Sequence, residues 1–222
     1  MGMVQKGKLQ RNRLLLIGGA VSAPLFFAVA IVQVFTRSGF DIRRHAISTL
    51  TLGEMGWIQS ANFILTGCLA VFAAIGIRDL LRGGKGSVWG PLLIGIYGIG
   101  MIGAGLFRPD PGLSFPPGAP EGMPTSMSSS AAVHSLAFFT AFLCLVAACF
   151  VFARQFALRG DRVWRTYCVA TGILAPVLIG VGMAMNSWIG VIMGFAGVVA
   201  FGWVSALSVR LRAESFLEVE KE

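Results

Sequence analysis

The sequence predicts an all-α integral membrane bundle of six transmembrane helices, with both termini cytoplasmic and a short interfacial helix in the first outer loop. Three observations point to this fold: the composition, the length of the apolar runs and the placement of basic residues. Of 222 residues, 55% are hydrophobic and only 13% are charged. A soluble domain carries about 25% charged residues, so this composition excludes a soluble enzyme, a disordered protein and a disulfide-rich secreted module.

Six apolar runs are each long enough to cross a bilayer as a helix, which takes about 20 residues. A helix satisfies its own backbone hydrogen bonds, as lipid requires, and the alternating pattern of a membrane barrel is missing from the sequence. We predict a single membrane domain over 14–208, flanked by a basic cytoplasmic tail at 1–13 and a charged cytoplasmic tail at 209–222. The predicted spans are 14–36, 57–77, 88–107, 131–153, 165–185 and 187–208, the last two joined by a tight turn at Asn186 and Ser187.

Basic residues are distributed unequally between the predicted sides of the membrane. Fourteen of the 18 Lys and Arg residues fall in the two tails and in the loops 78–87 and 154–165. Cytoplasmic segments carry an excess of basic residues, so we predict that both tails are cytoplasmic and that the loops 37–56 and 108–130 lie outside. Scattered basic residues of this kind indicate topology, and we expect no nucleic-acid partner.

Polar residues from several segments are predicted near the outer face. Asn62 lies about one and a half turns into the second span, Asp110 follows the third span, and His134 lies in the first turn of the fourth. Such convergence at one depth is typical of a pocket at the mouth of a bundle. The candidate ligand-binding residues are Arg43, Arg44, Ser48, Asn62 and Arg108.

Asp110 and His134 allow two interpretations. In one pocket they are candidate catalytic residues, acting as a general acid–base pair. In the other interpretation they are structural, with Asp110 either capping a helix or paired to Arg108 and with His134 bonded to the second outer loop, because ion pairs also gather at helix ends. Arg43 and Arg44 either grip an anionic head group or anchor the loop at the interface.

The two outer loops differ in character. In the first loop, Ile42, Ala46, Ile47 and Leu50 recur at roughly helical spacing beside charged residues, which predicts a short amphipathic helix at the outer interface. The second loop is rich in proline, which fixes φ and removes backbone donors, so we expect a stiff extended cover there.

Small residues recur in the third and sixth spans, the latter with the pattern Gly190-x-x-x-Gly194. They let helix backbones approach closely, either inside the bundle or between copies or partner helices. The candidate partners are therefore membrane lipid and, through these glycine-rich faces, a second copy or a partner helix.

No cofactor or metal site is expected. The four cysteines lie in apolar runs without a C-x-x-C pair, and the chain has two histidines, so a three-His zinc site is impossible. No charged residue lies deep within a predicted span, which argues against a proton-coupled transporter.

Three groups of residues carry a resemblance to a known family: Arg44, His45, Ser48, Leu50, Leu52 and Gly53, then Gly56 to Gln59, Asn62, Phe63, Thr66 and Gly67, then Gly105, Phe107, Asp110, Pro111, Phe115 to Gly118 and His134. Together they resemble an uncharacterised bacterial membrane family, the domain of unknown function 998. The resemblance spans about 14–210 and implies a multi-pass bundle in a bacterial inner or plasma membrane, without an established activity. Many members carry an acidic residue where Thr49 stands here.

Three functional hypotheses remain open. The first is a membrane module that binds a lipid or a partner through a polar pocket at the extracytoplasmic face. The second is a membrane-embedded enzyme that acts on a lipid or isoprenoid with Asp110 and His134 as acid and base. The third is a facilitative transporter that uses neutral polar groups.

Overall fold

The computed structural model describes residues 3–81, 87–185 and 187–217, and over these residues the chain is all-helical. Six of its helices are long and apolar enough to cross a membrane, which confirms the predicted fold class. They are α1 (Met3–Thr36), α2 (Gly56–Leu80), α3 (Trp89–Leu106), α4 (Ser129–Leu158), α5 (Arg162–Ala184) and α6 (Ile189–Leu217), with a short 3₁₀ helix, η1 (Ile47–Thr51), between α1 and α2.

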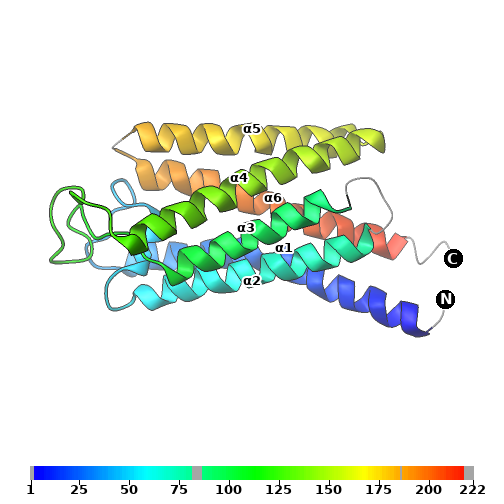
Figure 1. Ribbon diagram of the computed structural model, residues 1–222, viewed down its shortest axis with the longest axis horizontal. Coiled ribbons are helices and arrows are strands. Elements are labelled where there is room, and N and C mark those ends of the chain that lie inside the picture. The colour runs from blue at the N-terminus through cyan, green and yellow to red at the C-terminus, as the bar shows by residue number, and fades with distance from the viewer. Residues whose placement is uncertain (1–2, 82–86, 186, 218–222) are drawn as a thin grey trace.

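The helices run alongside one another along the long axis of the molecule (Figure 1). The segments 37–55 and 107–128 gather at one end, here called the loop end, and both chain termini lie at the opposite end, the tail end (Figure 1). Each helix packs on its successor in the chain, and α6 packs back on α1, so the six helices close a ring.

Helix ends are set by local capping. The Ser128 side chain accepts a hydrogen bond from the Ala131 amide at the start of α4, and Asp161 does the same for Trp164 at the start of α5. Such caps satisfy amides that have no partner within the helix. Helices α1, α4 and α6 extend beyond their predicted spans, and the turn predicted at Asn186 and Ser187 includes Asn186, which lies outside the described residues.

Glycines set the close approach of neighbouring helices inside the ring. A Cβ atom on Gly67 of α2 would lie 2.5 Å from the carbonyl oxygen of Gly98 of α3, and one on Gly98 would lie 2.7 Å from the Gly67 oxygen. Gly190 packs in the same way on the carbonyls of Ile42 and His45 in the first outer loop. The glycines named here are therefore covered within the chain, and association with a second copy or a partner helix stays a prediction.

The short helix predicted in the first outer loop is present as η1, and one side of it packs against the protein. The only helical part of the loop is η1, whose Leu50 and Thr51 are fully buried. Leu50 and Leu52 pack with Phe115 of the second outer loop into a small apolar core of their own. This burial removes apolar surface from water, and the sequence spacing of the loop could not distinguish it from burial in lipid.

Charged residues at the tail end pair with one another. Arg11 of α1 contacts Asp79 of α2 at 2.6 Å, and Arg210 of α6 contacts Asp161 at the start of α5 at 3.2 Å. These pairs tie helices together at the end opposite the loops, away from the candidate site described next.

Candidate functional site

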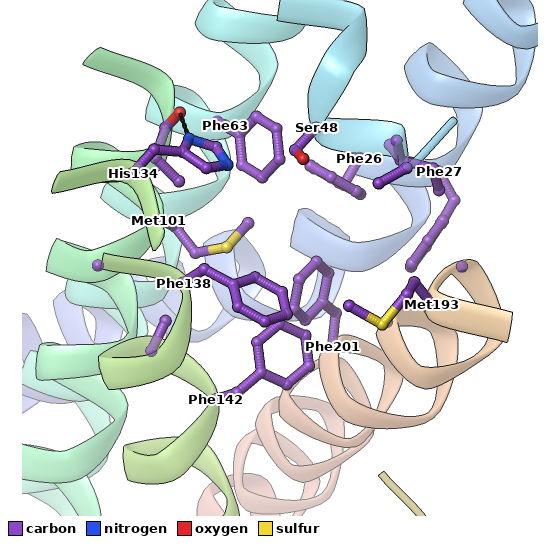
Figure 2. Close-up of a pocket in the computed structure, with 17 residues that line it drawn as sticks. Phe26, Phe27, Ser48, Phe63, Met101, His134, Phe138, Phe142, Met193 and Phe201 are labelled. Carbon is purple, nitrogen blue, oxygen red and sulfur yellow. Dashed lines mark hydrogen bonds between the residues drawn. The ribbon is translucent and has the colours of Figure 1, made fainter. Parts of the chain in front are cut away.

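An apolar cavity lies inside the helix ring, toward the loop end. It has a volume of about 80 Å³, and α1, α2, α3, α4 and α6 all contribute to its wall, together with the start of η1. Figure 2 shows His134, Phe63 and Ser48 at one end and Phe138, Phe142, Phe201 and Met193 at the other. The wall is formed by Phe26, Phe27, Ala46, Ile47, Ser48, Phe63, Gly100, Met101, Ala104, His134, Phe138, Ala141, Phe142, Met193, Gly194, Gly197 and Phe201.

Aromatic rings from four helices meet around Phe201 of α6. Its ring centroid lies 5.2 Å from that of Phe26, 5.5 Å from that of Tyr97 and 5.7 Å from that of Phe142. Edge and tilted contacts of this kind stabilise aromatic clusters beyond the area that they bury. The cluster gives the deep part of the cavity a rigid apolar wall.

His134 is the one titratable side chain among the residues that line the cavity, and it is 6% exposed. Its Nδ1 lies 3.1 Å from the carbonyl oxygen of Ala104 and 2.9 Å from that of Phe107. Both partners are acceptors, so Nδ1 carries the hydrogen, and in the neutral ring Nε2 then carries a lone pair. Nε2 is on the side of the ring that faces the cavity (Figure 2).

The first outer loop closes the cavity at the loop end through Ala46, Ile47 and Ser48. His45 holds this segment against the second outer loop. The Asp41 amide donates to its Nδ1 at 2.9 Å, so its Nε2 carries the hydrogen and donates to the Leu113 carbonyl at 3.0 Å.

Arg37 also holds the two outer loops together at this end of the cavity. Its guanidinium donates to the carbonyl of Leu50 at 3.1 Å and to that of Leu52, and it lies 5.7 Å from the ring centroid of Phe115. A buried carbonyl needs a donor, and one arginine supplies two here. The roof of the cavity is therefore held by contacts between both outer loops.

The structure does not bring Asp110 and His134 together. Asp110 accepts a hydrogen bond from the Ser128 amide at 2.9 Å, and hydrogen bonding from Ser128 lowers the pKa of this carboxyl. His134 instead bonds to the carbonyls of Ala104 and Phe107, and the cavity wall does not include Asp110. Asp110 thus supports the start of α4, beside the Ser128 cap.

The three candidate arginines lie outside the cavity, and all are exposed. Arg43 contacts Asp41 at 2.8 Å, and the side-chain hydrogen bond from Arg43 lowers the pKa of Asp41 to about 2. Arg44 follows it on the surface, and at Arg108 the backbone amide and carbonyl both bond to the Ser130 hydroxyl. Of the five candidate ligand-binding residues, only Ser48 lines the cavity.

Asn62 lies in the interface between α1 and α2, behind the cavity wall. Its amide nitrogen donates to the Phe26 carbonyl at 3.0 Å and to Gln59 Oε1 at 3.2 Å, and Gln59 Oε1 also accepts from Gln33 at 2.8 Å. Interhelical amide bonds of this type hold transmembrane helices together. Asn62 therefore positions Phe26 and does not face the cavity itself.

The sequence alone assigned no binding role to the apolar wall residues and no linking role to the two loop residues Arg37 and His45. The only local signal for the wall is helical spacing, for example Phe138 followed by Phe142 or Gly194 followed by Gly197 and Phe201. That spacing is the same for a face in contact with lipid and for a face that lines an internal cavity. The signal for the wall was therefore present but ambiguous.

Comparison with known protein families identifies the family of this chain. The family model described as protein of unknown function DUF998 matches residues 20–210. The chain belongs to the DUF998 family. The match covers all six spans of this DUF998 protein except the start of α1 and the end of α6. No curated protein and no solved structure matches it.

The chemistry available in this DUF998 protein is limited by its side chains. Within 3–81, 87–185 and 187–217, no group of three His, Cys, Asp or Glu side chains is placed to hold a metal ion. The cavity offers one lone pair on His134, one hydroxyl on Ser48 and otherwise aromatic, aliphatic and thioether surface.

Proposed function

We propose that this DUF998 protein is a lipid-binding module of a bacterial inner or plasma membrane, and that its cavity holds the apolar chain of a membrane component. The observation that carries the proposal is an apolar cavity lined by five helices and by Ala46, Ile47 and Ser48 of the first outer loop. With the orientation that the basic residues predict, the cavity lies in the outer half of the membrane.

The size and lining of the cavity indicate what fits. A water-sized group needs about 10–15 Å³ of such volume, so 80 Å³ accommodates about five to eight groups of that size. This is a short alkyl or prenyl chain, or the end of a longer one. A bound chain gains dispersion contacts with the aromatic wall.

Binding is favoured over the two alternative functions. The acid–base hypothesis needs Asp110 beside His134, and their hydrogen bonds instead go to Ser128 and to backbone carbonyls. The transporter hypothesis needs a polar path, and the cavity wall holds only two polar side chains at one end.

Photolabelling tests this proposal. The probe is an octyl chain that carries a photoactivatable diazirine, added to the full chain in lipid vesicles, with labelled peptides mapped by mass spectrometry. Gly194→Leu fills the cavity, since a Cβ there meets only Ile47 Cδ1, at 3.4 Å. Gly202→Leu is the matched control on the same helix, because a Cβ at Gly202 meets no atom within 4 Å.

We expect label on wall peptides of α4 and α6. The label should be unchanged in Gly202→Leu and reduced about tenfold in Gly194→Leu, which corresponds to a loss of about 1.4 kcal/mol of binding free energy. Label spread evenly over lipid-facing positions, or equal in the two variants, would contradict the proposal.

A further inference from the structure

The polar groups of the cavity are few and lie at one end. Of the residues in its wall, only His134 and Ser48 carry polar side chains, and none carries a permanent charge. Both lie at the end opposite Phe138, Phe142 and Phe201 (Figure 2). A molecule with its chain against these rings therefore presents its other end to His134 and Ser48.

Two backbone carbonyls fix the hydrogen-bonding role of His134. Its Nδ1–H is shared between the carbonyls of Ala104 and Phe107, which close the C-terminal turn of α3. The neutral ring therefore presents an acceptor, Nε2, to the cavity, and no hydrogen bond to Nε2 comes from the described residues. A nearly buried acceptor without a donor is costly, so the site favours a ligand that brings a hydrogen-bond donor.

Ser48 supplies a complementary group. Its backbone carbonyl accepts from Thr51, which fixes the turn of η1, while no hydrogen bond is found for its hydroxyl among the described residues. A hydroxyl both donates and accepts, so it can serve a ligand oxygen that donates to His134.

We propose that the cavity selects a neutral alcohol, with an O–H group that donates to His134 Nε2 and a short aliphatic or prenyl chain against the aromatic wall. The inference rests on the proposed function and names the ligand class for the same cavity. A carboxylate or phosphate would place its charge against the Nε2 lone pair, in a wall without a cation, at a large desolvation cost. An ether or a hydrocarbon leaves Nε2 without a donor.

The test measures competition against the octyl diazirine probe. The competitors are 1-octanol, methyl octyl ether and octanoate, compared at equal concentration in the bilayer. Geraniol and 1,2-dioctanoylglycerol are added to distinguish a prenyl alcohol and a diglyceride from an aliphatic alcohol. We expect 1-octanol to compete about tenfold better than the ether, as one hydrogen bond gives, and octanoate to compete least.

Two variants test the assignment to His134. His134→Asn keeps an N–H donor near the Nδ1 position for the Ala104 and Phe107 carbonyls. Its amide oxygen is then near the Cδ2 position and no acceptor is left at the Nε2 position, so the tenfold preference should fall while labelling by the hydrocarbon probe stays. Ser48→Ala changes a hydroxyl that holds no other element, so a reduced preference there cannot be due to misfolding. If His134→Asn does not fold, the ¹⁵N resonance of His134 Nε2 in the unaltered chain should shift with 1-octanol, and that of His45 should not.

The outcomes separate the two proposals. Specific labelling of the cavity with equal competition by alcohol and ether, or with octanoate as the best competitor, overturns the alcohol assignment and leaves the lipid-binding function standing. Labelling that Gly194→Leu does not reduce overturns both. An alcohol preference that survives both His134→Asn and Ser48→Ala overturns the role of these residues.

Discussion

At the scale of single residues, the two histidines of the chain are opposite tautomers and have different roles. His45 accepts at Nδ1 from the Asp41 amide and donates from Nε2 to the Leu113 carbonyl. His134 donates from Nδ1 to two carbonyls and keeps Nε2 free for the cavity. His45 bonds within its own loop through Nδ1 and to the second outer loop through Nε2. His134 has Nε2 available to a ligand.

These tautomers can be measured. We expect the two-bond ¹H–¹⁵N spectrum of the histidine rings to show one ring with hydrogen on Nε2 and one with hydrogen on Nδ1, because the neighbouring groups allow only these forms. His45→Gln, which keeps a donor toward Leu113, assigns the signals by removing one set. Two rings in the same tautomer would refute the site geometry.

A second prediction concerns Asp41 and Arg43, on the outer surface. The side-chain hydrogen bond from Arg43 holds the pKa of Asp41 at about 2, below the ordinary 3.8. A lowered carboxyl pKa means that the contact stabilises the fold fully above the ordinary value and loses this effect as pH falls toward 2.

We therefore expect Arg43→Ala to raise the pKa of Asp41 toward 3.8, measured from the carboxyl ¹³C shift during an acid titration. Arg44→Ala is the control, since Arg44 is exposed and is not among the causes of the Asp41 shift. The amide of residue 43 still donates to Asp41 in this variant, so part of the lowering remains. A pKa that stays at about 2 would show that the Arg43 side chain is not its main cause.

At the scale of helices and loops, packing decides which faces are available for binding. Gly67 and Gly98 bring α2 and α3 into backbone contact, and Gly190 lets α6 meet the first outer loop. The cavity lies where larger side chains from several helices meet and do not fill the space between them. Gly67, Gly98 and Gly190 are thus part of the frame of the bundle. Gly100, Gly194 and Gly197 instead line the cavity.

Gly67→Ala tests this packing. The new methyl group would lie 2.5 Å from the Gly98 carbonyl oxygen, so the helices must separate. Overpacking of this kind costs about 1–3 kcal/mol and should lower the melting temperature in detergent by about 3–10 °C. Gly180→Ala on α5 is the matched control, because no atom lies within 4 Å of a Cβ there. Equal melting temperatures for the two variants would contradict the contact.

At the scale of the whole molecule, the ring of helices has two distinct ends. Both termini and most of the basic residues are at the tail end, and the two long loops are at the other, where the first of them closes the cavity (Figure 1). An even number of spans places both termini on one side of a membrane, and the charge asymmetry predicts that this side is the cytoplasm.

Reporter fusions test that orientation. A fluorescent protein that folds only in the cytoplasm should be fluorescent at either terminus, and alkaline phosphatase inserted in the 107–128 segment should be active outside. The reverse pattern would place the cavity in the inner half of the membrane and leave its geometry unchanged. Activity of alkaline phosphatase at one terminus alone would refute an even number of crossings.

The sequence by itself determined the six membrane-spanning helices and therefore the placement of both termini at one end. Those features follow from bilayer thickness and from the need to satisfy the backbone within each span, and both requirements appear locally in the chain. It also placed His134 and Ser48 in the candidate site. Only the tertiary structure decided that Asp110 bonds to the Ser128 amide beside the start of α4, that η1 packs against Phe115, and that an aromatic cavity lies beside His134. Each of these depends on helix rotation or on contacts between residues far apart in the chain, such as His45 with Leu113, and residue spacing along one segment carries no information about either.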